Sequence, residues 1–246
     1  MKGKNTRIET VPDLCNNGEA HRFTVIERVS SEGVMAKCAA CGKETTLREK
    51  QDFADFDRDE SHFYTLDNDG NAVITSYNCS ATKVYFPGTI DGHEVVAIDL
   101  DENMEWPLDE DKNLNIGGSI TDVSIAPGIE RIEPRAFCKW VSLREVYLME
   151  GLRSVGDSAL TRTSMQQVYL PDGLERLGSG VFGRSSAVFV SIPASVKEID
   201  EPETLAELND NETAFFVSED NPNYSSANGS LCSKDQKTVY LEYKNR

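Results

Sequence analysis

An apolar pattern that recurs every 22 or 23 residues constrains this chain more than any other feature of its sequence. The anchors Ile125, Leu148, Leu170 and Ile192 follow one another at intervals of 23, 22 and 22 residues. Three further apolar series keep this spacing: Ile129, Leu152, Leu174 and Val196; Ile132, Val155, Leu177 and Ile199; and Phe137, Leu160 and Phe182. A register shared over so many positions identifies structural repeats.

Repeats of this kind predict a solenoid. Each unit contains a short strand, a turn and a looser return segment, and no unit can bury its apolar side alone. Stacking places Leu148 over Leu170 over Ile192, with strands about 4.8 Å apart in a parallel ladder. Repeats of about 20 to 29 residues with apolar positions in this phase are typical of leucine-rich repeats. We therefore predict an α/β-type but mostly β solenoid with one parallel strand in each 22–23-residue repeat.

The repeat unit also resembles a known family, the BspA-like leucine-rich repeats. The segments Pro127 to Cys138 and Leu170 to Phe182 carry most of that pattern, and the resemblance covers about residues 63–246. By this resemblance, Asp69 to Tyr77 belongs to an N-terminal capping hairpin. It also implies that Cys138 packs in the core.

The resemblance implies an end cap as well. A recurring insertion follows the repeats, with its two strands at Ala214 to Val217 and Thr238 to Tyr243. The predicted parts of the chain are a small zinc-ribbon-like unit at 1–48, a charged linker at 49–62 and a leucine-rich repeat domain at 63–246. Within that domain we expect an N-terminal cap at 63–83, repeats at 84–199, and an insertion with a C-terminal cap at 200–246.

Four cysteine and histidine residues near the N-terminus have the spacing of a metal site. Cys15 and His21 are separated by five residues, and Cys38-x2-Cys41 is followed by Gly42. Two such pairs, joined by a hairpin of Phe23 to Arg28 and Gly33 to Lys37, suit a tetrahedral zinc ion. Four protein ligands leave no open position, so we predict a structural zinc. A Cys38–Cys41 redox pair, free thiols or a disulfide of Cys15 are the alternatives.

Strand alternation predicts a ligand-binding face. Val146 and Leu148 are expected to point inward and Tyr147 outward. Stacking then gives three exposed columns: Ser124, Tyr147, Tyr169 and Ser191; Arg144, Gln166 and Val188; and Glu145, Gln167 and Phe189. The predicted face for a protein or glycan consists of Arg144, Tyr147, Gln166, Gln167, Tyr169, Phe189 and Ser191. The alternative is ordinary sheet propensity, because tyrosine and phenylalanine favour strands.

Charge and missing motifs narrow the function. A net charge of −17 disfavours nucleic acid and anionic membranes as partners. No apolar stretch approaches the roughly 20 residues of a membrane span, and the first residues lack the apolar region of a secretory signal. The segment Asp67 to Gly70 resembles a calcium loop but lacks its final acid, so we predict a hairpin turn. No nucleophile, phosphate-binding or metalloprotease motif is present.

We therefore expect a non-enzymatic protein that binds a protein or glycan. By resemblance it acts in adhesion or host interaction, secreted or at the cell surface; a cytoplasmic location is the alternative. A structural scaffold without a strong ligand is the second hypothesis, and a cysteine-dependent redox enzyme is the third.

Overall fold

A computed structural model divides the chain into two compact units, Met1–Ala54 and Asp55–Arg246. In the first unit the structure describes the backbone of strands at 23–29, 33–38 and 44–46. In the second it describes residues 62–77, 81–100, 119–207, 209 and 213–244.

The first unit contains a three-stranded antiparallel sheet. Strand β1 (Phe23–Val29) pairs with β2 (Gly33–Cys38), which also pairs with β3 (Glu44–Thr46). The β1–β2 register shifts between Val25 and Glu27, which marks a bulge. The hairpin predicted over Phe23 to Arg28 and Gly33 to Lys37 is therefore present.

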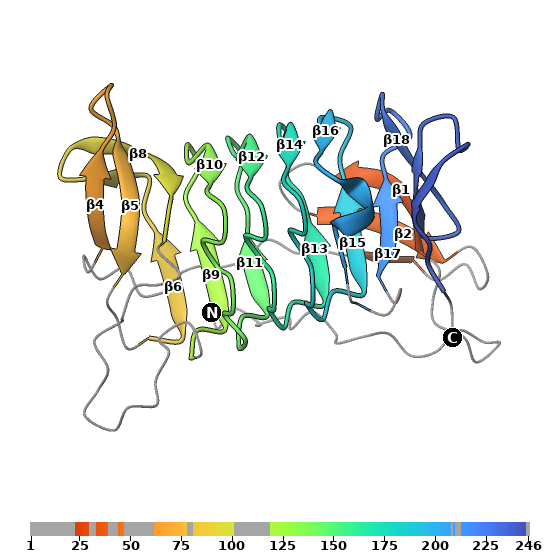
Figure 1. Cartoon of the computed structure of the whole chain (residues 1–246), viewed down its shortest axis with the longest axis horizontal. Coiled ribbons are helices and arrows are strands. Elements are labelled where there is room, and N and C mark those ends of the chain that lie inside the picture. Colours follow the sequence, from red (N-terminus) through yellow and green to blue (C-terminus); the bar gives the residue numbers. More distant parts are fainter. Residues whose placement is uncertain are drawn as a thin grey trace, which may run out of the picture. The chain divides into compact units, whose positions relative to one another are not determined.

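The second unit is the predicted solenoid, and its longer strands run parallel to one another (Figure 1). Two sets of three strands pair, in the orders β6–β9–β11 and β13–β15–β17. Their bounds are Lys83–Phe86 for β6, Asp122–Ile125 for β9, Glu145–Tyr147 for β11, Gln167–Tyr169 for β13, Phe189–Ile192 for β15 and Ala214–Val217 for β17. We call this row of strands the first ladder.

Each repeat contributes a second short strand, so the prediction of one strand per repeat was wrong. The second ladder is formed by β8 (His93–Ile98), β10 (Arg131–Ile132), β12 (Ser154–Val155), β14 (Arg176–Leu177) and β16 (Glu198–Ile199). Its strands pair in parallel from turn to turn. The N–H of Gly156 donates to the carbonyl of Ile132 at 2.8 Å, and the N–H of Gly178 donates to that of Val155 at 2.8 Å. The segment after each turn is therefore extended because its amides bond to the previous repeat.

Close stacking explains a glycine in this second ladder. A Cβ added at Gly178 would lie 2.4 Å from the backbone nitrogen of Asp157 in the preceding turn. A side chain there would force two turns apart, so the sequence has glycine where backbones approach.

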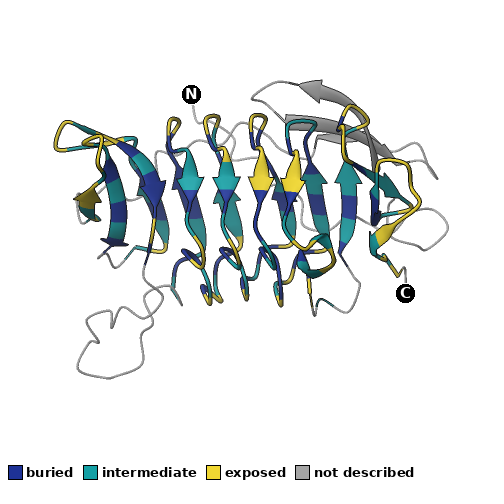
Figure 2. Cartoon of the chain, turned by 45° about the horizontal axis from the view of Figure 1, so that its top comes forward, coloured by how far each residue is buried: buried dark blue, intermediate teal, exposed yellow. Residues whose placement is uncertain are grey.

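The four predicted apolar columns form the core. None of their members is more than 4% exposed, and buried positions recur from turn to turn along the solenoid (Figure 2). The described residues contain no α-helix; they contain one short 3₁₀ helix, η3 (Pro202–Thr204). The mostly β part of the fold prediction is confirmed.

An antiparallel hairpin closes the N-terminal end. Strands β4 (His62–Leu66) and β5 (Ala72–Tyr77) pair with each other, and β5 also pairs in parallel with β8. A short strand β7 (Thr89–Ile90) lies against β8. His62, predicted to lie in the linker, is the first residue of β4, and its ring packs 5.2 Å from that of Tyr77.

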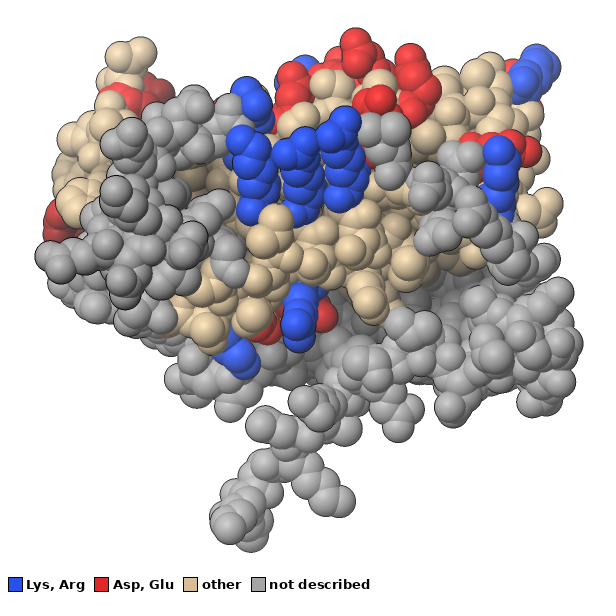
Figure 3. All heavy atoms as spheres, turned by 60° about the horizontal axis from the view of Figure 1, so that its bottom comes forward, with Lys and Arg blue, Asp and Glu red and all other residues tan. Residues whose placement is uncertain are grey.

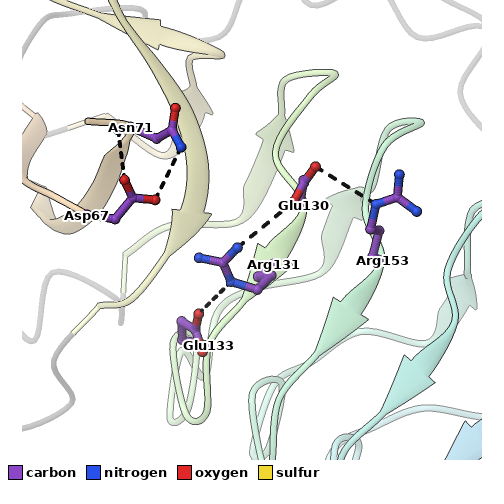
Figure 4. A network of polar contacts seen from close by, with 6 residues as sticks. All are labelled: Asp67, Asn71, Glu130, Arg131, Glu133 and Arg153. Carbon is purple, nitrogen blue, oxygen red and sulfur yellow. Dashed lines mark hydrogen bonds and ion pairs between the residues drawn. The ribbon is translucent and has the colours of Figure 1, made fainter. Parts of the chain in front are cut away.

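The predicted turn of this hairpin is also present. Asp67 Oδ1 accepts the N–H groups of Asp69 and Asn71, each at 2.9 Å, and the Asp67–Asn71 contacts appear in Figure 4. The backbone N–H of Asn71 lowers the pKa of this carboxyl. The Asp67 oxygens accept hydrogen bonds from residues of the turn itself, which supports a hairpin turn and not a calcium loop.

The C-terminal insertion differs from its prediction. Ala214–Val217, predicted as a strand of the insertion, belongs to the repeats instead, because β17 pairs with β15 and extends the first ladder. The antiparallel sheet consists of β18 (Tyr224–Ala227), β19 (Ser230–Ser233) and β20 (Val239–Leu241). The turn between β18 and β19 is Asn228-Gly229, with φ of 52° and 84°. Such a pair is the strongest short hairpin signal.

A buried amide joins this insertion to the last repeat. Asn221 is fully buried, and its Nδ2 donates to the carbonyls of Pro193 at 2.9 Å and Val196 at 2.8 Å. Its Oδ1 accepts the N–H of Tyr224 at 2.8 Å, and the Tyr224 hydroxyl accepts the N–H of Ile199 at 2.9 Å. The insertion thus supplies partners that a further repeat would otherwise provide.

We predict that Asn221→Ala lowers the free energy of unfolding by about 3 kcal/mol, because several buried backbone groups lose their partner at once. Chemical denaturation measures the change. Asn223→Ala is the control, because Asn223 is exposed and contacts the Lys197 carbonyl through its side chain. This variant should lower the free energy of unfolding by less than about 1 kcal/mol. Equal losses in both variants would contradict the capping role of Asn221.

Candidate ligand-binding face

The outward residues of β13, β15 and β17 form the candidate face. Backbone pairing sets their positions in two columns: Gln167, Phe189 and Ala214; and Tyr169, Ser191 and Phe216. All six side chains are half-buried. The structure therefore brings together Gln167, Tyr169, Phe189 and Ser191 as the sequence predicted.

Three rings make a continuous aromatic surface across these strands. The centroids of Tyr169 and Phe189 lie 5.3 Å apart, and those of Phe189 and Phe216 lie 4.8 Å apart. The second pair is stacked, with 25° between the ring planes. We call Tyr169, Phe189 and Phe216 the aromatic cluster. Contacts of this geometry stabilise the rings beyond the burial of their area.

Phe216 was missing from the predicted face, although the sequence contained a signal for it. Ala214–Val217 was assigned to a strand of the C-terminal insertion, so its residues were not aligned with the repeats. The observed register places Phe216 beside Ser191 in the column that begins with Tyr169. Aligning Ala214–Val217 with the preceding repeats would have placed Phe216 on the predicted face.

Polar and apolar side chains border the cluster. The Tyr169 hydroxyl donates to Gln167 Oε1 at 2.9 Å, which holds the amide against the ring edge. Gln166 is exposed, and Val188 is 41% exposed. The face therefore offers hydrogen-bonding groups next to apolar surface, a composition that suits recognition of another molecule.

Two members of the predicted exposed column are buried. Backbone pairing places Ser124 beside Tyr147, as stacking predicted, and beside Tyr85 on its other side. Ser124 is 0% exposed and Tyr147 is 6% exposed, so the predicted exposure of both residues was wrong. Alternation gives the direction of a side chain but not its coverage, and a short serine between two tyrosines is easily covered. Arg144 is exposed, immediately before β11.

The predicted metal ligands Cys15, His21 and Cys41 lie outside the described residues, as does the side chain of Cys38, whose backbone ends β2. Among the described residues, no group of three histidine, cysteine or acidic side chains could hold a metal ion.

The two described cysteines are free. Cys138 is partly exposed, so its prediction as a core residue was wrong: its neighbour Phe137 fills that core position and is 0% exposed. Cys232 is buried, and burial raises the pKa of its thiol. A raised pKa leaves little of the reactive thiolate form.

The second ladder presents charges that pair among themselves (Figure 4). Arg153 Nε lies 3.8 Å from Glu130 Oε1, and its Nη1 lies 3.9 Å from Glu175 Oε1. Arg176 pairs with Glu198 and Asp200 in the same way. Exposed pairs of this kind stabilise a fold only slightly. They do, however, leave these arginines with partners inside the chain.

We predict that Ser124→Ala leaves stability unchanged or raises it by about 1 kcal/mol. The Ser124 hydroxyl is buried and has no hydrogen-bond partner among the described residues, and an unpartnered buried hydroxyl destabilises the folded state. Chemical denaturation tests this. Ser191→Ala, in the same column, is the control and should change the free energy of unfolding by about zero. A loss above about 1 kcal/mol for Ser124→Ala would show that the hydroxyl has an essential partner.

Comparison with known proteins shows which family the repeats resemble. Residues 114–204 match the model of the BspA type leucine rich repeat region, in six copies. No match was found among curated proteins. No helix in the described part of the chain is long and apolar enough to cross a membrane.

One solved structure shows the same fold, and others are similar to this chain. A T. pallidum leucine-rich repeat protein has 26% identity and a TM-score of 0.53, over 65% of this chain and 69% of that one. The pneumococcal vaccine antigen PcpA has 17% identity and a TM-score of 0.48, over 72% of this chain and 53% of that one. A Eubacterium ventriosum leucine-rich repeat protein has 18% identity and a TM-score of 0.43, over 73% of this chain and 48% of that one. This chain thus spans about half the length of the latter two. Residues 114–204 are thus similar to leucine-rich repeats of the BspA type, and the T. pallidum protein shares the fold.

Proposed function

We propose that the second unit is a binding module whose aromatic cluster contacts a protein or glycan partner. The contiguous rings of Tyr169, Phe189 and Phe216 carry this proposal. Leucine-rich repeat proteins generally bind proteins or other ligands and are generally not enzymes.

The backbone beneath the cluster supports this role. Each ring stands on a strand whose neighbours fix its position through parallel pairing. Rings held in this way lose little conformational freedom when a partner binds, which favours affinity. Each half-buried ring also retains apolar surface, whose removal from water contributes about 25 cal/mol per Å².

The border of the cluster supports specificity. Gln166 is exposed beside it, and Gln167 and Ser191 are half-buried within the same columns. Aromatic rings next to amide and hydroxyl groups match both protein surfaces and sugar rings, since both combine apolar faces with hydrogen-bonding edges. The family resemblance extends the proposal to adhesion or host interaction at the cell surface.

The test is a binding screen of the purified chain against a panel of matrix proteins and a glycan array. For any partner found, the double variant Tyr169→Ala/Phe189→Ala should weaken binding about 30-fold or more, because truncating aromatic anchors typically costs at least 2 kcal/mol. The control is Phe63→Ala, which removes a ring that is 59% exposed on β4. This control should bind like the unmodified chain.

Two outcomes would count against the proposal. Equal affinity of the double variant and the unmodified chain would show that the cluster is not the binding face. Absence of any partner in the panel, with the fold intact, would favour the alternative of a structural scaffold. A scaffold should also tolerate changes throughout the cluster.

We also propose that Cys15, His21, Cys38 and Cys41 hold a structural zinc ion in the first unit. Support comes from the backbone: β2 ends at Cys38 and β3 begins at Glu44. The Cys38-x2-Cys41-Gly42 segment therefore spans the connection between two antiparallel strands. Cysteine pairs with this spacing are typical of structural zinc sites.

We expect one zinc per chain when metal content is measured by mass spectrometry on protein purified without chelator. Cys38→Ser should lose the metal and unfold the first unit, because binding and folding are coupled in small zinc domains. Cys138→Ser, a free cysteine in the repeats, is the matched control and should keep it. Metal-free protein with Cys15, Cys38 or Cys41 oxidised would contradict zinc and favour a disulfide or a redox pair.

A further inference from the structure

A row of basic side chains occupies one turn in each of three successive repeats, on turns that follow the second ladder. Its members are Lys139, Arg162 and Arg184, spaced by 23 and 22 residues. The N–H of Lys139 donates to the Thr161 carbonyl at 2.9 Å, and that of Arg162 to the Gly183 carbonyl at 3.0 Å. Equivalent turns are thus bonded in register, and their backbones lie about 4.8 Å apart. We call these three residues the basic row.

The backbone at the basic row does not favour long side chains. The φ angles of Lys139, Arg162 and Arg184 are 67°, 61° and 53°, in the left-handed region. Glycine adopts this conformation without strain, and other residues adopt it at a cost. Gly180, with φ of 60°, occupies another left-handed turn position of the same repeats. The turn therefore does not require lysine or arginine.

The charges of the basic row have no partners among the residues that the structure describes. All three side chains are exposed, and none forms a hydrogen bond or ion pair with any residue that the structure describes. Arg153 and Arg176 on the second ladder differ, because each has carboxylate partners. Basic side chains gather in a row on the face that Figure 3 brings forward. Three cations without a partner in the described part of the chain are thus adjacent, in a protein with a net charge of −17.

We propose that the basic row binds a sulfated polysaccharide. A guanidinium group donates two parallel hydrogen bonds to an oxyanion such as sulfate. A row of such groups, repeated about every 4.8 Å, suits a linear chain that carries its anions on the outside. The proposal is independent of the aromatic cluster, which lies on the strands of the first ladder.

One observation favours a glycan over an acidic peptide that pairs as a strand. The backbone N–H groups of all three residues already donate within the solenoid, so an acidic peptide cannot add to this edge as a strand. The row itself ends near an acidic residue, because the N–H of Arg184 donates to the carbonyl of the exposed Glu207. The anionic ligand therefore contacts a short stretch of about three charges.

The experiment measures binding of the full chain to heparin, with desulfated heparin and polyglutamate as competing probes. Arg162→Gln/Arg184→Gln should weaken heparin binding at least tenfold and reduce its salt dependence. The matched control, Arg153→Gln/Arg176→Gln, removes the same charge from arginines that have partners. It should change the affinity less than twofold.

A second pair of variants separates binding from folding. Arg162→Gly/Arg184→Gly should lose heparin binding while the thermal unfolding midpoint stays the same or rises, because glycine relieves the left-handed strain. Equal loss of affinity in the matched control would overturn the proposal, as would equal binding of desulfated heparin. Polyglutamate binding as tight as heparin would replace the glycan with an acidic protein. A lower midpoint with heparin binding retained would show that the arginines serve the fold.

Discussion

Contact between successive turns is the interaction on which the whole second unit depends. No repeat buries its own apolar columns, and the amides of one turn bond to carbonyls of the neighbouring turn in both ladders. Such an array has two open ends with unpaired groups and exposed core. The β4–β5 hairpin covers the first end, and Asn221 and Tyr224 satisfy backbone groups at the other.

The same stacking creates the candidate binding surfaces. Because every turn repeats the last, a side chain that points outward in one turn has a counterpart about 4.8 Å away in the next. On the first ladder this gives the contacts among Tyr169, Phe189 and Phe216. On the turn edge it gives the basic row. On the second ladder it places Arg153 between Glu130 and Glu175, where the charges offset one another.

The sequence predicted what depends on the repeat period and missed what depends on local context. Spacing was enough to identify the columns of Ile125 and Ile132, because each buried member recurs. The second strand of each repeat was missed because its two-residue strands carry no alternation of their own. The burial of Tyr147 depends on coverage, and the β18–β19 hairpin on the turn pair Asn228-Gly229. The four metal ligands remain a prediction, since their side chains lie outside the described residues.

Native-state hydrogen exchange of the second-ladder amides tests the central claim, that a second ladder bonds each repeat to the next in addition to the first ladder. The amides of Gly156, Gly178 and Asp200 donate to Ile132, Val155 and Leu177 of the preceding turn. The account predicts slow exchange at all three, comparable to that of Val190 in the first ladder, because only opening of the stack frees them. Exchange as fast as that of unprotected amides, with Val190 still protected, would contradict it and leave one strand per repeat.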